Sequence, residues 1–235
     1  ISTLLFVLSI LLIVLYFTFN DPKEHHPLET KKVNNDIITK DVVDRLEKVQ
    51  ELYKENSDLV GWIQINDTKI DYPVMYTKGK DYYLYRDFYK EKYNPGSLFI
   101  DKYNTVNPRD TNLIIHGHNM DDGSMFHDLT KYQDKKFYKS HKTFKFYTLN
   151  GEETYEIISV FLSQVYNVDD NVFKYYKFYD AKDENEYISY IENIKKLSLY
   201  KIDTTASYNT ELLTLSTCEY SKDNGRLVVV AKKIS

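Results

Sequence analysis

The chain has 235 residues, of which 42% are hydrophobic and 15% aromatic, and this apolar content is enough to fill the core of a sizeable domain. A formal net charge of −4, with no basic stripe that carries interleaved aromatic residues, argues against a general nucleic-acid-binding protein. The seven glycines form no GxGxxG or GxxxxGK phosphate loop, so nucleotide binding has little support.

The N-terminal residues 1–19 are uncharged and strongly apolar. As a helix they would extend about 28 Å, close to the hydrocarbon thickness of a bilayer. No small-residue cleavage site follows them, which favours an uncleaved transmembrane signal anchor over a cleaved signal peptide. We therefore expect a single-pass protein of the cell membrane, with the large domain that follows the anchor extracellular. Residues 20–35 are polar and contain two prolines, which is typical of a tether.

Residues 36–57 carry one apolar stripe at helical spacing and predict an N-terminal helical segment packed on the domain that follows. From residue 58 to residue 235 the pattern is mostly that of short strands. The strand candidates are 59–65, 69–75, 97–101, 111–117, 144–149, 154–166, 211–218 and 226–234. Eight short strands favour a closed β-barrel or a sandwich.

One amphipathic helix is predicted at about 183–200, inside the connection between two late strands. Tyr187, Tyr190, Ile191, Ile194 and Leu197 share one of its faces. A long connection on a rigid β scaffold often carries binding function, but a helix that merely covers the barrel has the same pattern. Both interpretations stay open at this point.

Cys218 is the only cysteine, and it ends the strand candidate ELLTLSTC. A single cysteine has no partner for an internal disulfide, so it is a free reactive thiol, a partner in an intermolecular disulfide, or a small buried hydrophobe. A free thiol is mostly protonated at neutral pH, so a nucleophilic Cys218 would require a base or a positively charged neighbour.

Two histidines, His116 and His118, lie near the end of the strand candidate in NLIIHGHNM. Either imidazole suits proton transfer in both directions, and either is equally well explained as a structural histidine. Zinc bound by both histidines and Cys218 is the competing hypothesis, completed by Asp121, Asp122 or His127. Their spacing matches no standard zinc pattern, and we expect no metal.

Arg226 is the candidate positive neighbour of Cys218. If residues 221–225 form a five-residue hairpin loop, Arg226 lies opposite Tyr220 and on the same sheet face as Cys218, about 7 Å along the strand. A two-residue Asn224-Gly225 turn would reverse the parity and separate the two side chains.

Taken together, these segments resemble the sortases, the cysteine transpeptidases of Gram-positive bacteria. The GHNM and TLSTC blocks carry the resemblance, with the nearby arginine. DLVGWIQINDTKIDYPVM and NPGSLFIDKYN are similar to class B segments in the same order, over most of residues 36–235. The resemblance implies an eight-stranded sortase-type barrel with N-terminal helices and one helix inserted in a late strand connection.

The same resemblance implies the roles of individual residues. Cys218 is the expected nucleophile, His118 the general acid/base and Arg226 the oxyanion-stabilising group. Ser216 matches a position that lines the substrate groove in that family, and we expect Tyr166 to line the same groove, although no motif fixes it. His116 departs from the family's pattern, in which a tyrosine or an apolar residue is common.

The implied reaction cleaves a C-terminal sorting motif of secreted proteins after threonine, through a thioacyl intermediate, and joins them to a peptidoglycan amine without a cofactor. A membrane-anchored cysteine protease or hydrolase, and a non-enzymatic surface binding domain, remain the alternatives. A papain-like protease fits poorly, because there the cysteine precedes the histidine and opens a helix.

Overall fold

The structure is a computed structural model that describes residues 31–33, 36–38 and 40–235. It divides into two compact units, residues 1–43 and 44–235. Strands β1 (Lys31–Val33) and β2 (Asp36–Ile38) form a short antiparallel hairpin, and helix α2 spans Lys40–Glu55. The helix therefore begins at Lys40 and not at residue 36 as expected, because residues 36–38 pair with β1.

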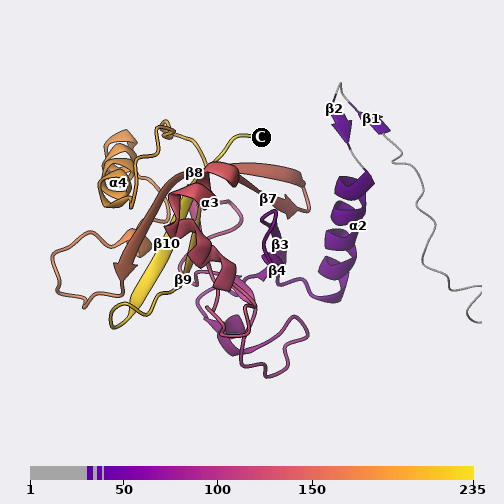
Figure 1. Ribbon diagram of the computed structural model, residues 1–235. Helices are drawn as coiled ribbons and strands as arrows, with labels where there is room; N and C mark the ends of the chain where they lie inside the picture. The colour runs from indigo at the N-terminus through magenta and orange to yellow at the C-terminus, as the bar shows by residue number, and fades with distance from the viewer. Residues whose placement is uncertain (1–30, 34–35, 39) are drawn as a thin grey trace, which may run out of the picture. The chain divides into compact units, whose positions relative to one another are not determined.

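Eight strands close into a barrel in the order β10-β8-β7-β3-β4-β5-β6-β9 (Figure 1). This confirms the mostly-β, eight-stranded barrel that the sequence predicts. The barrel strands are β3 (Leu59–Gln64), β4 (Asp71–Met75), β5 (Leu98–Ile100), β6 (Asn112–His116), β7 (Thr143–Thr148), β8 (Gly151–Gln164), β9 (Leu212–Cys218) and β10 (Gly225–Lys233).

Most neighbouring strands are antiparallel, including the expected β3–β4 hairpin, but β4–β5 and β6–β9 are parallel. The parallel pairing of β6 with β9 brings the C-terminal ends of these two strands to the same edge of the barrel. His116 ends β6 directly beside Ser216 of β9. Chain segments about one hundred residues apart thus become neighbours at this edge.

Strand β9 is buried on both faces and separates two apolar clusters. Leu213 and Leu215 belong to the cluster inside the barrel, and Leu212 belongs to a second cluster on its outer wall. Because side chains alternate along a strand, the residues of β9 with even numbers share the outer face. Ser216 and Cys218 therefore also lie on the outer face of the barrel.

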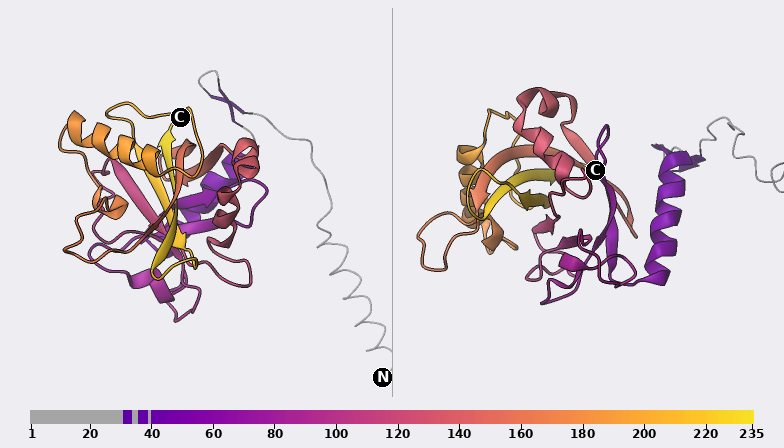
Figure 2. Two further views of the ribbon diagram at one scale, coloured as in Figure 1. Left: turned by 60° about the vertical axis from the view of Figure 1, so that its left-hand side comes forward. Right: turned by 60° about the horizontal axis from the view of Figure 1, so that its bottom comes forward.

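Helix α4 (Glu184–Leu197) covers part of this outer wall (Figures 1 and 2). The Asp183 side chain caps its first turn by accepting a hydrogen bond of 2.9 Å from the Glu186 backbone N–H. Its buried side chains pack against the outer residues of β8, β9 and β10, and they are Tyr187, Tyr190, Ile191 and Ile194. Each such side chain stabilises the packing by about 1.5–3 kcal/mol relative to exposure. The predicted inserted helix is confirmed.

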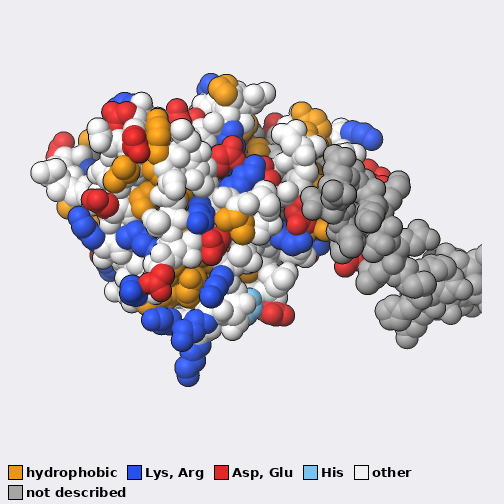
Figure 3. Space-filling view, turned by 90° about the horizontal axis from the view of Figure 1, so that it is seen from above, with side chains coloured by type: hydrophobic (Ala, Val, Ile, Leu, Met, Phe, Trp, Pro, Cys, Tyr) orange, Lys and Arg blue, Asp and Glu red, His pale blue; other side chains and the backbone are white. Residues whose placement is uncertain are grey.

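Several short elements were not predicted from the sequence. They are the 3₁₀ helices η1 (Tyr82–Tyr85), η2 (His127–Gln133) and η3 (Tyr175–Lys177) and the short helix α3 (Lys135–Ser140). Such single turns lack a sustained apolar period, and their positions depend on tertiary contacts. Over most of the face drawn in Figure 3, positive and negative side chains are interspersed.

The membrane localisation expected from the sequence is corrected here. Within the described part of the chain, no helix combines the length and the apolar character that crossing a bilayer requires. The span expected at residues 1–19 and most of the expected tether lie outside the described residues.

Gly61 of β3 gives a test of how tightly the barrel is packed. A Cβ atom at this position would lie 2.6 Å from the Tyr147 carbonyl oxygen and 2.7 Å from the Phe146 ring. We expect Gly61→Ala to lower the free energy of unfolding by about 1–3 kcal/mol, measured by urea denaturation. Thr143→Ala, at an exposed position of β7, is the control and should change it by less than about 0.5 kcal/mol. A Gly61→Ala variant as stable as this control would contradict the packing.

Candidate active site

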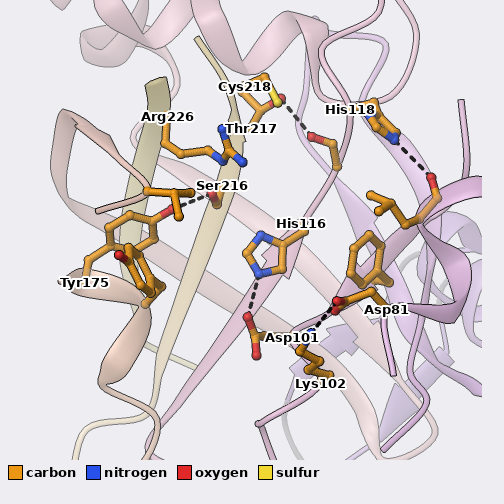
Figure 4. Close-up of a pocket in the computed structure, with 15 residues that line it drawn as sticks. Asp81, Asp101, Lys102, His116, His118, Tyr175, Ser216, Thr217, Cys218 and Arg226 are labelled. Atoms are coloured by element: carbon orange, nitrogen blue, oxygen red, sulfur yellow. Dashed lines mark hydrogen bonds and ion pairs between the residues drawn. The ribbon is translucent and has the colours of Figure 1, made fainter. Parts of the chain in front are cut away.

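A pocket of about 350 Å³ opens on the outer face of the barrel, at the end where β6 and β9 terminate (Figure 4). The strands supply its floor, and η1 contributes one wall with Leu84. The connection between β8 and α4 contributes another wall with Val165, Tyr175 and Tyr176. Helix α4 itself does not line the pocket. The long connection thus both lines the pocket and, through its helix, covers the barrel.

Cys218 and Arg226 lie directly opposite each other in the antiparallel pair of β9 and β10. The expected register, with Arg226 opposite Tyr220, is wrong by two residues, because the loop between the strands is Glu219 to Asn224. The shift is an even number of residues, so the Cys218 and Arg226 side chains still lie on one face of the sheet, as expected for the five-residue loop. Side chains at opposed positions have Cβ atoms only about 4.5–5.5 Å apart, which is closer than the offset expected from the sequence.

The guanidinium of Arg226 is held by the backbone of this loop. Its Nη1 donates hydrogen bonds of 2.8 Å to the Gly225 carbonyl and 3.3 Å to the Asn224 carbonyl. Among the described residues no carboxylate lies within 4.0 Å of it. In Figure 4 the side chain extends from β10 toward β9, so its remaining N–H groups face the pocket. A permanent cation is thereby placed beside the thiol.

His118 lies on the opposite side of the pocket from Arg226, in the loop that follows β6 (Figure 4). Its Nε2 is 3.0 Å from the Leu84 carbonyl oxygen, and its ring lies 5.5 Å from the Tyr85 ring, centre to centre. A carbonyl oxygen only accepts, so Nε2 carries a proton. Nδ1 is then the nitrogen left to take up or release a proton in the pocket.

A network of hydrogen bonds ties the loop after β6 to the end of β9. The Thr217 hydroxyl donates to the Gly117 carbonyl at 2.8 Å, and the Asn119 amide donates to the Cys218 carbonyl at 3.1 Å. His127 holds the Asn119 side-chain oxygen through Nδ1 at 2.9 Å. These bonds fix the backbone of His118 relative to that of Cys218.

Gly117 is required between the two histidines because nothing larger fits there. A Cβ atom would lie 2.6 Å from the Phe126 ring and would also overlap the Leu98 side chain. This close approach lets the chain turn out of β6 while its neighbours fill the core. His127 takes part in the network through Asn119, and within the described residues no three His, Cys, Asp or Glu side chains are grouped to hold a metal.

His116 forms a hydrogen-bonded pair with Asp101 that the sequence analysis did not predict. His116 Nε2 lies 2.8 Å from Asp101 Oδ2, and both residues line the pocket. Burial raises the pKa of the Asp101 carboxyl, but the hydrogen bond and charge of His116, with the Tyr103 backbone N–H, outweigh it and hold the pKa below its ordinary value of 3.8. Asp101 follows β5, and only the β5–β6 pairing brings it to His116.

The two predicted groove residues are placed differently. Ser216 lines the pocket, and its hydroxyl is 2.8 Å from that of Tyr175. Burial of Tyr175 raises its pKa to about 12, so this hydroxyl stays neutral. Tyr166 is not among the lining residues; its backbone N–H donates to the Tyr176 hydroxyl at 3.0 Å. Tyr175 and Tyr176, which the sequence analysis did not single out, take the lining role instead.

Comparison with known proteins gives consistent results. The model of the sortase domain matches residues 63–234. Sortase B of Listeria monocytogenes is 39% identical over 191 residues, which cover 80% of this chain and 75% of that protein. Sortase B of Staphylococcus aureus is 33% identical over 187 residues, covering 79% and 74%. The crystal structure of Clostridium perfringens sortase B superposes with a TM-score of 0.71 at 33% identity, covering 79% of this chain and 99% of that one.

The Asp101–His116 pair should make stability depend on pH in a defined direction. Because folding lowers the pKa of Asp101, its ionised form stabilises the folded state above pH 3.8, and this contribution is lost as the pH falls through the folded-state pKa. We expect Asp101→Asn to lower the free energy of unfolding by about 1–3 kcal/mol at pH 7, and by less at pH 3. Urea titrations of both proteins at the two pH values measure this.

Asp67→Asn is the matched control for this prediction, since Asp67 pairs with His141 but its side chain is 85% exposed. Solvent screens such a pair, so the control should show a much smaller effect. A loss of stability in Asp101→Asn that is equal at pH 7 and pH 3 would contradict the stabilising role of the ionised Asp101 carboxylate.

Proposed function

Because this chain belongs to the sortase family, and within it to class B, we propose that it is a transpeptidase whose nucleophile is Cys218. Family membership makes the protein a sortase enzyme of cell-wall transpeptidation, acting on proteins with a sorting motif and on an amine acceptor. The finer proposal is that it cleaves a C-terminal motif after threonine, forms a thioacyl intermediate, and joins the acyl group to a peptidoglycan amine.

One observation carries this proposal. Cys218 and Arg226 are opposed on β9 and β10, and His118 lines the same pocket from the end of β6. A thiol, a permanent cation and an imidazole around one pocket are the groups that acyl transfer through a thioester requires. The two nearest carbonyls hold one nitrogen of Arg226, and its other N–H groups support its proposed role as an oxyanion donor.

In the first half of the reaction, the Cys218 thiolate attacks the carbonyl carbon of the threonine and forms a C–S bond. Negative charge develops on the carbonyl oxygen, and Arg226 donates hydrogen bonds to it. The tetrahedral intermediate collapses with cleavage of the C–N bond, and His118 gives its proton to the departing amine. The product is a thioester on Cys218 and a free C-terminal peptide.

In the second half, the acceptor amine attacks the thioester carbonyl carbon, and His118 takes the proton that the amine loses. Arg226 again faces the oxyanion. The C–S bond then breaks, Cys218 leaves as a thiolate, and a new amide bond joins the substrate to the acceptor. The Leu84 carbonyl, by holding His118 Nε2–H, leaves Nδ1 for both proton transfers.

The proposed nucleophile and base give one prediction about activity. Cys218→Ala should abolish cleavage of a sorting-motif peptide, and His118→Ala should lower kcat by about 10²–10⁴-fold because general acid–base catalysis is lost. Mass spectrometry of a peptide library, with and without an amine acceptor, measures both cleavage and transfer.

His141→Ala is the control, since this histidine lies outside the pocket and should leave kcat unchanged. Full activity of Cys218→Ala would refute the proposed nucleophile. Hydrolysis that an added amine does not divert would make the protein a hydrolase rather than a transpeptidase. Peptide binding that survives thiol alkylation, with no cleavage before or after the treatment, would leave only the binding-domain alternative.

The proposed role of Arg226 gives a second prediction. Arg226→Lys should lower kcat by about 10²–10³-fold with little change in KM, because a single ammonium does not reproduce the fork of guanidinium N–H groups at the oxyanion. Steady-state kinetics on the cleaved peptide measure both constants. A Lys variant with normal kcat would assign Arg226 a structural role in the β9–β10 loop.

A further inference from the structure

The floor of the pocket contains two polar pairs that the proposed chemistry does not use. His116 pairs with Asp101 at 2.8 Å, and Ser216 pairs with Tyr175 at 2.8 Å. The two pairs are neighbours, because His116 of β6 lies beside Ser216 of β9 in the parallel register. All four residues line the pocket, Ser216 and Tyr175 being almost fully buried, and we call this group the polar floor: Asp101, His116, Tyr175 and Ser216.

Asp101 determines which nitrogen of His116 is left for a ligand. A carboxylate with a lowered pKa is ionised and only accepts hydrogen bonds, so His116 Nε2 carries a proton. The Tyr103 backbone N–H holds the other carboxylate oxygen at 2.9 Å and fixes its orientation. His116 Nδ1 is then the ring atom without a protein partner among the described residues, and Figure 4 shows it turned toward the side of the pocket where Arg226 lies.

The neighbouring hydroxyls are neutral and retain spare hydrogen-bonding capacity. Tyr175 stays protonated because burial raises its pKa to about 12. When one hydroxyl of the Ser216–Tyr175 pair donates to the other, the acceptor's own hydrogen is free for a third group. Of the charged groups that line the pocket, Lys102 is paired with Asp81 at 2.7 Å, whereas Arg226 has no carboxylate partner among the described residues. The groups that the polar floor leaves for a ligand are therefore His116 Nδ1 and the hydroxyls of Ser216 and Tyr175, because the Asp101 carboxylate is already hydrogen-bonded to His116 and to the Tyr103 backbone.

A substrate side chain that covers the polar floor must satisfy these groups or leave them unpaired. Burying a donor or acceptor without a partner costs about 1–3 kcal/mol, which is roughly 5- to 150-fold in binding. A carboxamide or a hydroxyl satisfies such groups, and an apolar side chain of the same shape does not. The floor is thus built to discriminate between isosteres.

We propose that His116, held by Asp101, is a specificity-determining residue that binds an uncharged polar side chain of the peptide substrate, a carboxamide or a hydroxyl. Ser216 is next to His116, and Cys218 is two residues further along β9 on the same face. At about 3.3 Å per residue this separation equals two residues of an extended peptide. The side chain that is read belongs to a residue within two positions of the cleaved bond. This inference rests on the proposed function of the same pocket.

The test compares isosteric peptides on the wild-type protein and on His116→Phe. The substrate threonine that precedes the cleaved bond is kept. Asn/Leu and Thr/Val pairs are placed in turn at each of the other positions within two residues of that bond, and kcat/KM is measured. At one position the wild-type protein should prefer the polar member by about tenfold or more. His116→Phe should reduce this preference to about twofold or less, by losing activity on the polar peptide and not on the apolar one.

His141→Phe is the matched control, because His141 is also a partly buried histidine paired with an aspartate, at 3.2 Å, but lies outside the pocket. It should keep the wild-type preference. His116→Gln retains hydrogen-bonding atoms and should keep part of the preference. If the Phe variant does not fold, the ratio of kcat/KM for the polar and apolar peptides is compared between the wild-type protein and this Gln variant. Thermal unfolding of each variant establishes that it is folded.

The inference is overturned if the wild-type protein shows no polar preference at any position, or if both peptides lose activity equally in the His116 variants. It is also overturned if the preference survives unchanged in them. These outcomes differ from failure of the proposed function, in which cleavage is absent in the wild-type protein or persists in Cys218→Ala. Cysteine-dependent cleavage without a His116 effect removes only the present inference.

Discussion

The placement of strand β9 between β6 and β10 is the constraint on which the site depends. Its antiparallel pairing with β10 sets Arg226 opposite Cys218, and its parallel pairing with β6 sets His116 beside Ser216. Because side chains alternate along a strand, a slip of one residue would move Cys218 and Ser216 toward the barrel interior. Leu213 and Leu215 prevent such a slip, since they are fully buried in the interior cluster. The register that fills the core is therefore the register that assembles the site.

The outer face of the same strands serves two purposes. One part is covered by α4, whose aromatic and aliphatic side chains pack on Leu212, Val228 and Val230. The adjoining part is left open, and there the pocket forms between η1 and the connection that leads to α4. Rigid packing thus extends to the edge of the reacting groups. The backbone near the thiol is further fixed by the Thr217 and Asn119 hydrogen bonds, so the position of Cys218 relative to the loop after β6 is held by direct contacts.

The two histidines that flank Gly117 have different surroundings and, in our proposals, different roles. His118 is held by a carbonyl, which is uncharged, and its free nitrogen suits proton transfer. His116 is held by an ionised carboxylate, which orients the ring and leaves one nitrogen to the pocket. The resemblance to the sortases pointed to His118 for the acid/base role, but a pattern of residues alone does not distinguish the environments of two such closely spaced imidazoles. The partners Leu84 and Asp101 come from other parts of the chain.

The amino-acid sequence by itself determined the strands, the inserted helix and the identity of the residues available for chemistry. Alternation of apolar side chains is a local property, so the eight strands and the helix at 183–200 could be predicted from it. The start of α2 and the short 3₁₀ elements could not, since they have no sustained period. The expected membrane localisation was not supported by the described residues.

What only the tertiary structure decided is which residues meet. The pairing of Cys218 with Arg226 depends on the length of a loop, and the sequence analysis placed it two residues away. The Asp101–His116 pair depends on the β5–β6 pairing, and Tyr175 reaches Ser216 across a long connection. These contacts join segments distant along the chain, and the free energy that selects them comes from burying the whole core at once. No local pattern of residues contains that information.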